Sequence, residues 1–239
     1  MGILSLIEPA FVNRPRGGDP AVGDLYWVPT GYLQETPTIL DVQRSNPEEH
    51  GEVEFRLREI GASHFRGGRS LPIKQLNLEG TEELLVSRGK RRPCVVIART
   101  TVDNIAEITE ASQRRFAEKG VGKVLYLVAP CYTTAKLNER EKTFGPQLVA
   151  RIRALQYPHL FCLPERDKPD IPGSVVRLDR LFASFLARGC EALEYRLSAD
   201  ALEVFLSAAA SVLGGGDATL FVEMQNLIRE SGLPDEISN

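Results

Sequence analysis

The chain has few of the residues that build metal sites. Its cysteines are far apart in the sequence and form no Cys-x-x-Cys pair. They are Cys94, Cys131, Cys162 and Cys190. A structural zinc site needs clustered ligands, so we expect no such metal site and no cofactor. Three of the cysteines lie in or beside apolar runs, which indicates reduced core thiols in a cytoplasmic protein.

Several common enzyme motifs are also missing. The three histidines, His50, His64 and His159, are scattered and show no metal-ligand spacing, so we interpret each as a loop or interface residue. The chain contains neither a Gly-x-x-x-x-Gly-Lys-Ser/Thr motif nor a Gly-x-Ser-x-Gly motif. Nothing in the sequence therefore points to a P-loop nucleotidase, a serine hydrolase of that type or a histidine base.

No apolar run approaches membrane-spanning length, and the apolar start lacks a basic lead, so we expect neither a membrane span nor export. The formal net charge is only −3, so any contact with nucleic acid would need a local basic groove. With 239 residues, 43% of them hydrophobic, the chain can bury a sizeable core, and we expect one domain with insertions.

The most distinctive feature is a basic stretch that leads into a short apolar run, at residues 88–98. Its cations are Arg88, Lys90, Arg91 and Arg92. Crowded like charges repel one another, which favours a bound anion such as phosphate; the alternative is a solvated hairpin turn. Because Pro93 keeps the preceding residue out of the helical region, Arg92 has a defined direction and is the main candidate functional residue.

Sequence patterns predict many short strands. They are expected at 25–28, 38–40, 53–58, 82–86, 94–98, 124–128, 160–163 and 174–178. The strands at 82–86 and 94–98 are expected to form a hairpin with 88–92 at its tip. Apolar and charged residues alternate over 53–58, which predicts one buried and one exposed face.

Helices are expected at 103–119, from Pro146 onward, from the capping residue Ser198 to the glycines at 214–216, and at 217–229. Residues 181–186 also have helical spacing, so periodicity alone predicts a helix there.

Arg92 and Thr133 are candidates for a phosphate clamp. Each lies near the end of an expected strand, where side chains share a rim. A guanidinium offers a planar fork of donors, and a hydroxyl adds one hydrogen bond. The alternative, which spacing alone favours, is that the Thr-Thr pair only fills a turn or strand.

Five segments, in order along the chain, resemble the MazF/PemK toxins. They are residues 23–28 (Gly-Asp-Leu-Tyr-Trp-Val), 80–82 (Gly-Thr-Glu), 92–97 (Arg-Pro-Cys-Val-Val-Ile), 128–134 (Val-Ala-Pro-Cys-Tyr-Thr-Thr) and 174–180 (Ser-Val-Val-Arg-Leu-Asp-Arg). The resemblance implies a β-rich α+β fold, a small SH3-like barrel over residues 23–214 with an inserted β segment at about 30–79. Residues 1–22 would form an N-terminal arm, and closing C-terminal helices would end in a helix and tail at 215–239.

The same resemblance implies a metal-independent endoribonuclease, usually a homodimer, that a partner antitoxin inhibits. Arg92 matches the family's catalytic arginine and Thr133 its catalytic threonine, while the extra residue Tyr132 leaves Thr134 as the alternative hydroxyl. Glu82 matches the motif carboxylate and is the candidate base, or else it pairs with a nearby cation.

The remaining expected contacts are with single-stranded RNA. The residues expected to bind it are Arg88, Lys90, Arg91, Thr81 and Thr134. Trp27 or Tyr132 would stack on an unpaired base, the alternative for Trp27 being the core.

Two departures from the family pattern matter. About sixty residues separate the first strand from the Arg-Pro motif, where the family has a short loop, and Arg180 stands where the family has glutamine. The long insertion motivates an alternative function, a catalytically inactive barrel that binds nucleic acid or protein. A further alternative is a structural dimer held by the terminal helices.

Overall fold

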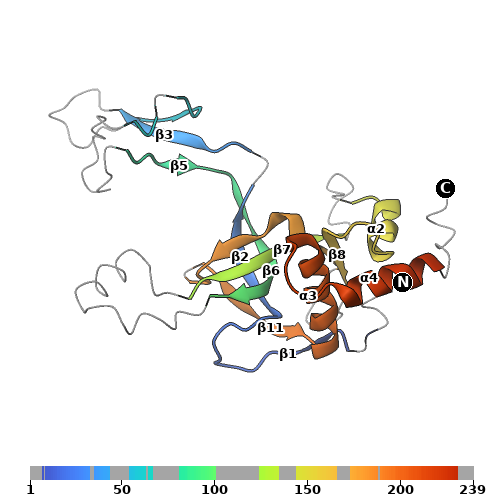
Figure 1. The fold of residues 1–239 in the computed structure, drawn as a ribbon. Coiled ribbons are helices and arrows are strands. Elements are labelled where there is room, and N and C mark those ends of the chain that lie inside the picture. Colours follow the sequence, from blue (N-terminus) through green and yellow to red (C-terminus); the bar gives the residue numbers. More distant parts are fainter. Residues whose placement is uncertain are drawn as a thin grey trace. The chain divides into compact units, whose positions relative to one another are not determined.

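The computed structural model describes residues 7, 9–32, 35–43, 54–62, 64–66, 81–100, 124–134, 144–165, 173–187 and 189–230. The expected helix at 103–119 and Gly80 of the Gly-Thr-Glu segment lie outside these residues. The chain forms two compact units (Figure 1). The first comprises Met1–Pro29 and Arg91–Asn239, and the second comprises Thr30–Lys90.

The first unit is built on a curled, half-barrel sheet of eight strands (Figure 1). Its strands are β1 (Phe11–Asn13), β2 (Asp24–Gly31), β6 (Gly89–Arg99), β7 (Tyr126–Thr133), β8 (Leu160–Leu163), β9 (Ser174–Arg177), β10 (Phe182–Ser184) and β11 (Glu191–Leu197). They are ordered β1-β11-β2-β6-β7-β9-β8, and β10 also pairs with β7. The ends of β2 and β6 belong to the second unit. The protein is therefore a mostly-sheet α+β fold, as the sequence predicts.

The two sides of this sheet carry different cores because successive side chains of a strand point to opposite sides. Val95 of β6 and Cys131 of β7 belong to the largest core, together with Phe205 of helix α3. Phe205 packs edge-on against Phe161 of β8, with ring centroids 5.3 Å apart. We call this the α3 side of the sheet. Cys94 and Val96 of β6 point away from α3 and pack in a second core. We call this the opposite side of the sheet.

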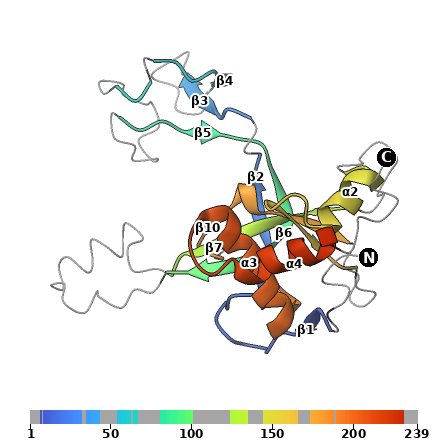
Figure 2. The same ribbon diagram turned by 45° about the vertical axis from the view of Figure 1, so that its right-hand side comes forward.

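Three helices, α2 (Pro146–Arg153), α3 (Ala199–Leu213) and α4 (Thr219–Glu230), occur in the described part of this unit. Ser198 caps α3 by accepting a hydrogen bond from the backbone N–H of Ala201 at 3.3 Å, and Gly214 ends it with φ 70°. The predicted bounds of α3 are confirmed. In both views α4 lies against α3 (Figures 1 and 2), and Ser207 of α3 accepts a hydrogen bond from the backbone of Phe221 at 3.0 Å.

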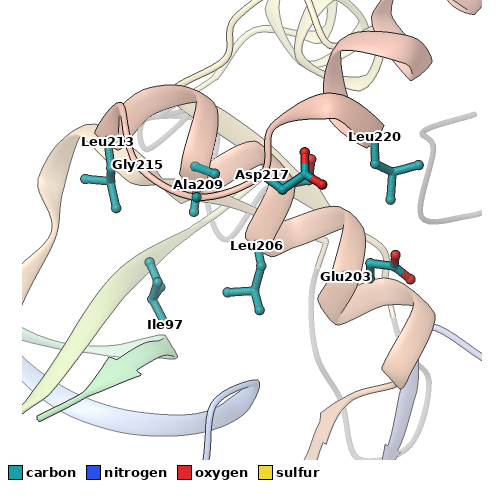
Figure 3. A pocket seen from close by; sticks show the side chains of 11 residues that line it. Ile97, Glu203, Leu206, Ala209, Leu213, Gly215, Asp217 and Leu220 are labelled. Atoms are coloured by element: carbon teal, nitrogen blue, oxygen red, sulfur yellow. The ribbon is translucent and has the colours of Figure 1, made fainter.

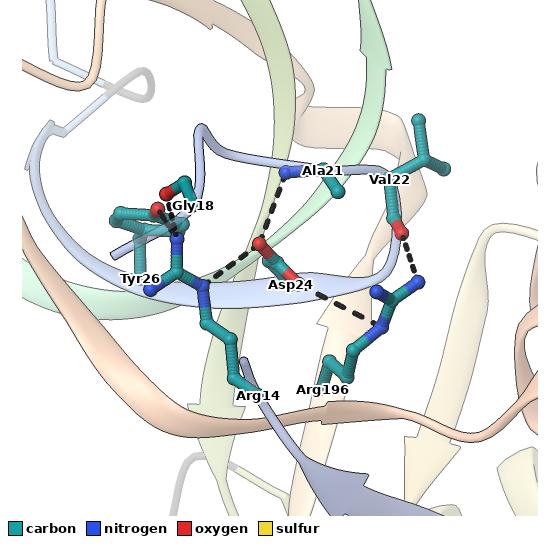
Figure 4. A network of polar contacts seen from close by, with 7 residues as sticks. All are labelled: Arg14, Gly18, Ala21, Val22, Asp24, Tyr26 and Arg196. Atoms are coloured by element: carbon teal, nitrogen blue, oxygen red, sulfur yellow. Dashed lines mark hydrogen bonds and ion pairs between the residues drawn. The ribbon is translucent and has the colours of Figure 1, made fainter. Parts of the chain in front are cut away.

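A buried ion pair holds the segment before β2 (Figure 4). The Nε of Arg14 donates to the Oδ2 of Asp24 at 2.9 Å, and the Arg14 Nη2 donates to the hydroxyl of Tyr26 at 2.7 Å. Asp24 is only 2% exposed, and the Nε of Arg196 lies 3.8 Å from its other oxygen. Two cations therefore balance one buried carboxylate.

The second unit contains a three-stranded sheet of order β4-β3-β5, built from β3 (Thr38–Gln43), β4 (Glu54–Arg58) and β5 (Leu85–Val86). The predicted hairpin is wrong, because β5 pairs with β3, and β6 already begins at Gly89. The basic stretch therefore lies largely within a strand. β5 does not pair with β6, the strand that follows it. It pairs instead with β3, more than forty residues earlier, where Ile39 lies opposite Leu85.

The predicted burial of one face of β4 is also wrong. Phe55 is 58% exposed and Leu57 is 62% exposed. Alternation correctly places these side chains on one face of the strand, but it does not determine what covers that face.

The helix that periodicity predicts at residues 181–186 is absent from the described chain. A 3₁₀ turn, η4 (Leu178–Arg180), is followed by β10, whose Phe182 pairs with Val128 of β7. Pairing with β7, a central strand of the curled sheet, overrides the local helical spacing, which is a weak preference on its own.

Candidate functional site

Arg92 of β6 lies over the aromatic ring of Tyr132 of β7. The strand register pairs Cys94 with Pro130, and continuing it by two residues places Arg92 opposite Tyr132. The guanidinium carbon of Arg92 is 4.2 Å from the centroid of the Tyr132 ring, well within cation–π range. Both side chains are half-buried. The neighbouring strand therefore fixes where this cation lies.

Arg180 of η4 approaches the same aromatic side chain. Its Nη1 donates to the Tyr132 hydroxyl at 3.2 Å, and its guanidinium carbon lies 5.7 Å from the ring centroid. Two guanidinium groups thus share one tyrosine. Such like charges repel each other, and a bound anion relieves that repulsion.

Asp179, the residue before Arg180, is already hydrogen-bonded to another arginine, Arg177. The Nε of Arg177 donates to the Oδ1 of Asp179 at 2.6 Å, and its Nη2 donates to Oδ2. These hydrogen bonds raise the pKa of Arg177 and lower the pKa of Asp179. Among the residues with described positions, no carboxylate pairs with Arg180, whose contacts are with Tyr132. We call Arg92, Tyr132, Arg177, Asp179 and Arg180 the arginine cluster; its formal charge is positive.

The two candidate threonines occupy different sides of the sheet. Thr133 pairs with Ser174 of β9. It lies two residues after Cys131 on β7, so its side chain points to the same side of the sheet as Cys131, the α3 side. Alternation directs Tyr132 and Thr134 to the opposite side of the sheet, which is also the side of the Arg92 side chain. Thr134 donates its hydroxyl hydrogen to the carbonyl of Gly173 at 2.8 Å. The alternation therefore puts Thr134 on the side of the Arg92 side chain, but its one hydroxyl hydrogen is already donated to Gly173, and the choice between Thr133 and Thr134 stays a prediction.

Trp27 lies on the surface beside another arginine. It is 36% exposed, so its alternative assignment to the core is wrong. The guanidinium carbon of Arg91 is 5.9 Å from the Trp27 ring centroid, and Arg91 Nη2 donates to Glu191 at 2.6 Å. This pair is exposed, and Glu191 offsets the charge of Arg91.

The other predicted site residues belong to the second unit. They are Thr81, Glu82, Arg88 and Lys90, all of them exposed. Arg88 pairs with Glu35 at 3.1 Å and lies 5.4 Å from the ring centroid of Tyr32. The structure thus brings Arg92 together with Tyr132 in the first unit and places these four residues in the second.

Sequence reasoning missed Arg177 and Arg180. Both lie within the segment 174–180 that carries the family resemblance. The available signal was the arginine that stands where the family has glutamine. Tyr132, the partner of Arg180, lies 48 residues away in the sequence, so sequence spacing could not predict the contact.

A cavity of about 400 Å³ lies between α3 and the start of α4 (Figure 3). Its walls are mainly apolar, from residues that include Ile97, Leu206 and Leu220. Two carboxylates, Glu203 and Asp217, also line it, which makes it unfavourable for a phosphate group. We therefore assign no RNA contact to this cavity.

Comparison with protein-family models gives no match, and comparison with curated protein sequences gives none either. Within the described ranges, no group of three His, Cys, Asp or Glu residues is placed to hold a metal ion. No helix in that part of the chain is both long and apolar enough to cross a membrane.

Proposed function

We propose that this protein is a toxin-like endoribonuclease of the MazF/PemK type, with an SH3-like barrel, that cleaves single-stranded RNA without a metal ion. The observation that carries the proposal is the position of Arg92 over Tyr132, with the guanidinium of Arg180 on the same side chain. Arginine and aromatic side chains together are the groups that bind single-stranded RNA. The order of the five family-like segments adds to this support.

In the proposed reaction the RNA supplies its own nucleophile. The 2′-oxygen attacks the adjacent phosphorus in line, and the bond from phosphorus to the 5′-oxygen breaks. The 2′-hydroxyl proton passes to a base, and the leaving 5′-oxygen gains a proton. The products are a 2′,3′-cyclic phosphate and a 5′-hydroxyl. DNA lacks the 2′-hydroxyl and is bound without being cut.

Arg92 binds the non-bridging oxygens and stabilises the charge that develops on them. A preorganised donor of this kind contributes about 3 kcal/mol, or roughly 100-fold in rate. Thr133 is the proposed hydroxyl donor to one of the same oxygens, and Thr134 is the alternative, which would first have to release its hydrogen bond to the Gly173 carbonyl. The resemblance gives the role of base to Glu82, and that role stays a prediction. Arg91 and Trp27 are proposed contacts for the backbone and an unpaired base.

The proposed biological setting is a toxin–antitoxin system. The protein acts as a cytoplasmic homodimer, and a partner antitoxin protein inhibits it. Arg88, Lys90 and Thr81 of the second unit are the further proposed RNA contacts.

The second candidate function is an inactive barrel that binds a partner through the second unit. The observation in its favour is the exposed apolar pair Phe55 and Leu57 on β4. Apolar side chains that lie together on a strand face are typical of a surface that another protein covers.

The experiment is RNA cleavage in the presence of a chelator by the wild type, Arg92→Gln and Arg99→Gln. Arg99 is an exposed arginine at the other end of β6, so its variant removes the same charge away from the site. We expect Arg92→Gln to cleave about 100-fold more slowly than the wild type and Arg99→Gln to cleave normally. Expression should likewise arrest growth for the wild type but not for Arg92→Gln. If the wild type and Arg92→Gln are equally harmless in cells and neither degrades RNA, the nuclease proposal fails and the binding module is favoured.

A further inference from the structure

We infer that the Tyr132 hydroxyl donates a hydrogen bond to the phosphate held by Arg92, and that Arg180 is a positioning residue that orients this hydroxyl. The inference rests on the proposed function, because it adds a donor to the same site. It assigns the hydroxyl contact to a tyrosine, in addition to the threonines that the sequence suggests.

The direction of one hydrogen bond supports this assignment. Arg180 is the donor to the Tyr132 oxygen, at 3.2 Å, since a guanidinium has no acceptor. A phenol has one hydrogen to donate besides its acceptor positions, so this contact leaves the Tyr132 proton for another acceptor. A hydrogen bond from a cation also polarises the hydroxyl and makes it a stronger donor.

The positive charges around Tyr132 favour an anion as the group that accepts the Tyr132 hydroxyl proton in a hydrogen bond. Arg92 and Arg180 both lie against the ring, with guanidinium carbons 4.2 Å and 5.7 Å from its centroid. The nearby carboxylate, Asp179, is taken by the bidentate contact with Arg177. A phosphodiester is an anion with oxygens that can accept from a guanidinium and from a hydroxyl at once.

The position of Tyr132 allows this contact. Tyr132, Arg92 and Arg180 are all half-buried, so none of the three residues is sealed in the core or fully solvated. The competing explanation is that Tyr132 only supports Arg92 through its ring. Tyr132→Phe separates the two, because it keeps the ring and removes only the hydroxyl.

The test measures cleavage at saturating RNA and, separately, binding of a mixed-sequence 2′-O-methyl RNA oligonucleotide, which has no free 2′-hydroxyl and resists cleavage. The variants are Tyr132→Phe, Arg180→Gln, their double variant and Arg99→Gln. We expect each single site variant to lose about 10- to 100-fold in the cleavage rate and to bind the oligonucleotide more weakly, with an unchanged melting temperature. At saturating RNA the double variant should cleave no more slowly than Tyr132→Phe, because Arg180 acts on the bound phosphate through that hydroxyl.

Each result decides the inference. Wild-type cleavage by Tyr132→Phe overturns the role of the hydroxyl, while the proposed nuclease stands. Additive losses in the double variant overturn the positioning role of Arg180. If the wild type cleaves no RNA, the proposed function fails, and binding alone decides: weaker binding by Tyr132→Phe supports the hydroxyl contact, and equal binding overturns it. A wild type that neither cuts RNA nor binds the oligonucleotide overturns both.

Discussion

The guanidinium carbon of Arg92 lies 4.2 Å from the centre of the Tyr132 ring, although forty residues separate them in the sequence. This contact joins the Arg-Pro segment of β6 to the end of β7, two of the segments that carry the family resemblance. It also gives the cation a fixed place before any ligand binds. Preorganisation of this kind is what allows a charge to stabilise a transition state.

Replacing Arg92 by lysine should slow RNA cleavage by about tenfold or more. Lysine keeps the charge but loses the planar fork that contacts two phosphate oxygens, and it stacks less well on the tyrosine ring. Single-turnover cleavage rates for Arg92→Lys, Arg92→Gln and the wild type measure the effect. We expect the lysine variant to fall between the other two. Wild-type cleavage by Arg92→Lys would show that a point charge is enough.

Replacing Asp24 by alanine should lower the free energy of unfolding by about 3–5 kcal/mol. The change leaves the cations Arg14 and Arg196 without their buried partner. The matched control is Glu191→Gln, which breaks the exposed pair with Arg91 and should cost less than about 1 kcal/mol. Denaturant unfolding measures both. Equal losses in the two variants would mean that burial of Asp24 has no energetic consequence.

Stability should fall as the pH rises above about 8.5, the ordinary pKa of a thiol. Burial raises the pKa of Cys131 to about 12 and raises the pKa of Cys94 further. The neutral thiols therefore stabilise the fold fully only well below pH 8.5, and each loses about 1 kcal/mol of that stabilisation between pH 8.5 and 9.5, because the unfolded chain loses the proton first. Burial also raises the pKa of Tyr26 and Tyr126, so measurements are best confined to pH 8.5–9.5.

Unfolding of Cys94→Ala and of the double variant with Cys131→Ala tests this pH dependence. Between pH 8.5 and 9.5, the slope of stability against pH should become shallower by about 1 kcal/mol per pH unit with each cysteine removed. An equally steep slope in the double variant would assign the alkaline loss to other groups.

Replacing Phe55 and Leu57 by serine should reduce binding of an apolar dye such as ANS without destabilising the protein by more than about 0.5 kcal/mol. Both side chains are more than half exposed, so they contribute little to the core. Arg56→Ser, on the other face of the same strand, is the control and should leave dye binding unchanged. Strong destabilisation by the double serine variant would show that this face is covered in solution.

The parts of the fold that the sequence predicts best are those governed by local chemistry. Helix α3 begins after Ser198 and ends at Gly214, because a capping hydroxyl and a left-handed glycine act within one turn. The strand predicted at 160–163 matches β8, whose apolar run has few alternatives. In contrast, local sequence does not determine which strand pairs with β5 or whether residues 181–186 form a helix or a strand. Both depend on strands that are distant in sequence, β3 and β7.

The same distinction applies to the site. Arg92 stands out because Pro93 follows it within a basic stretch, which is a local signal. Tyr132 enters the sequence reasoning as a candidate for base stacking and as an extra residue beside Thr133, not as a partner of Arg92 or Arg180. Its contact with Arg180 arises where η4 and β10 follow β9 and pack along β7, which no short motif encodes. The side of the sheet that each threonine occupies likewise depends on the register of β7.

The central claim is that the RNA's own 2′-hydroxyl is the nucleophile at Arg92. The most direct measurement compares an RNA oligonucleotide that the protein cuts with the same oligonucleotide carrying a single 2′-deoxy nucleotide at the cleaved position, both in the presence of a chelator. We predict that the RNA gives a 2′,3′-cyclic phosphate and a 5′-hydroxyl, and that the substituted oligonucleotide binds but stays intact. Cutting at the 2′-deoxy position, or products that carry a 5′-phosphate, would contradict the account.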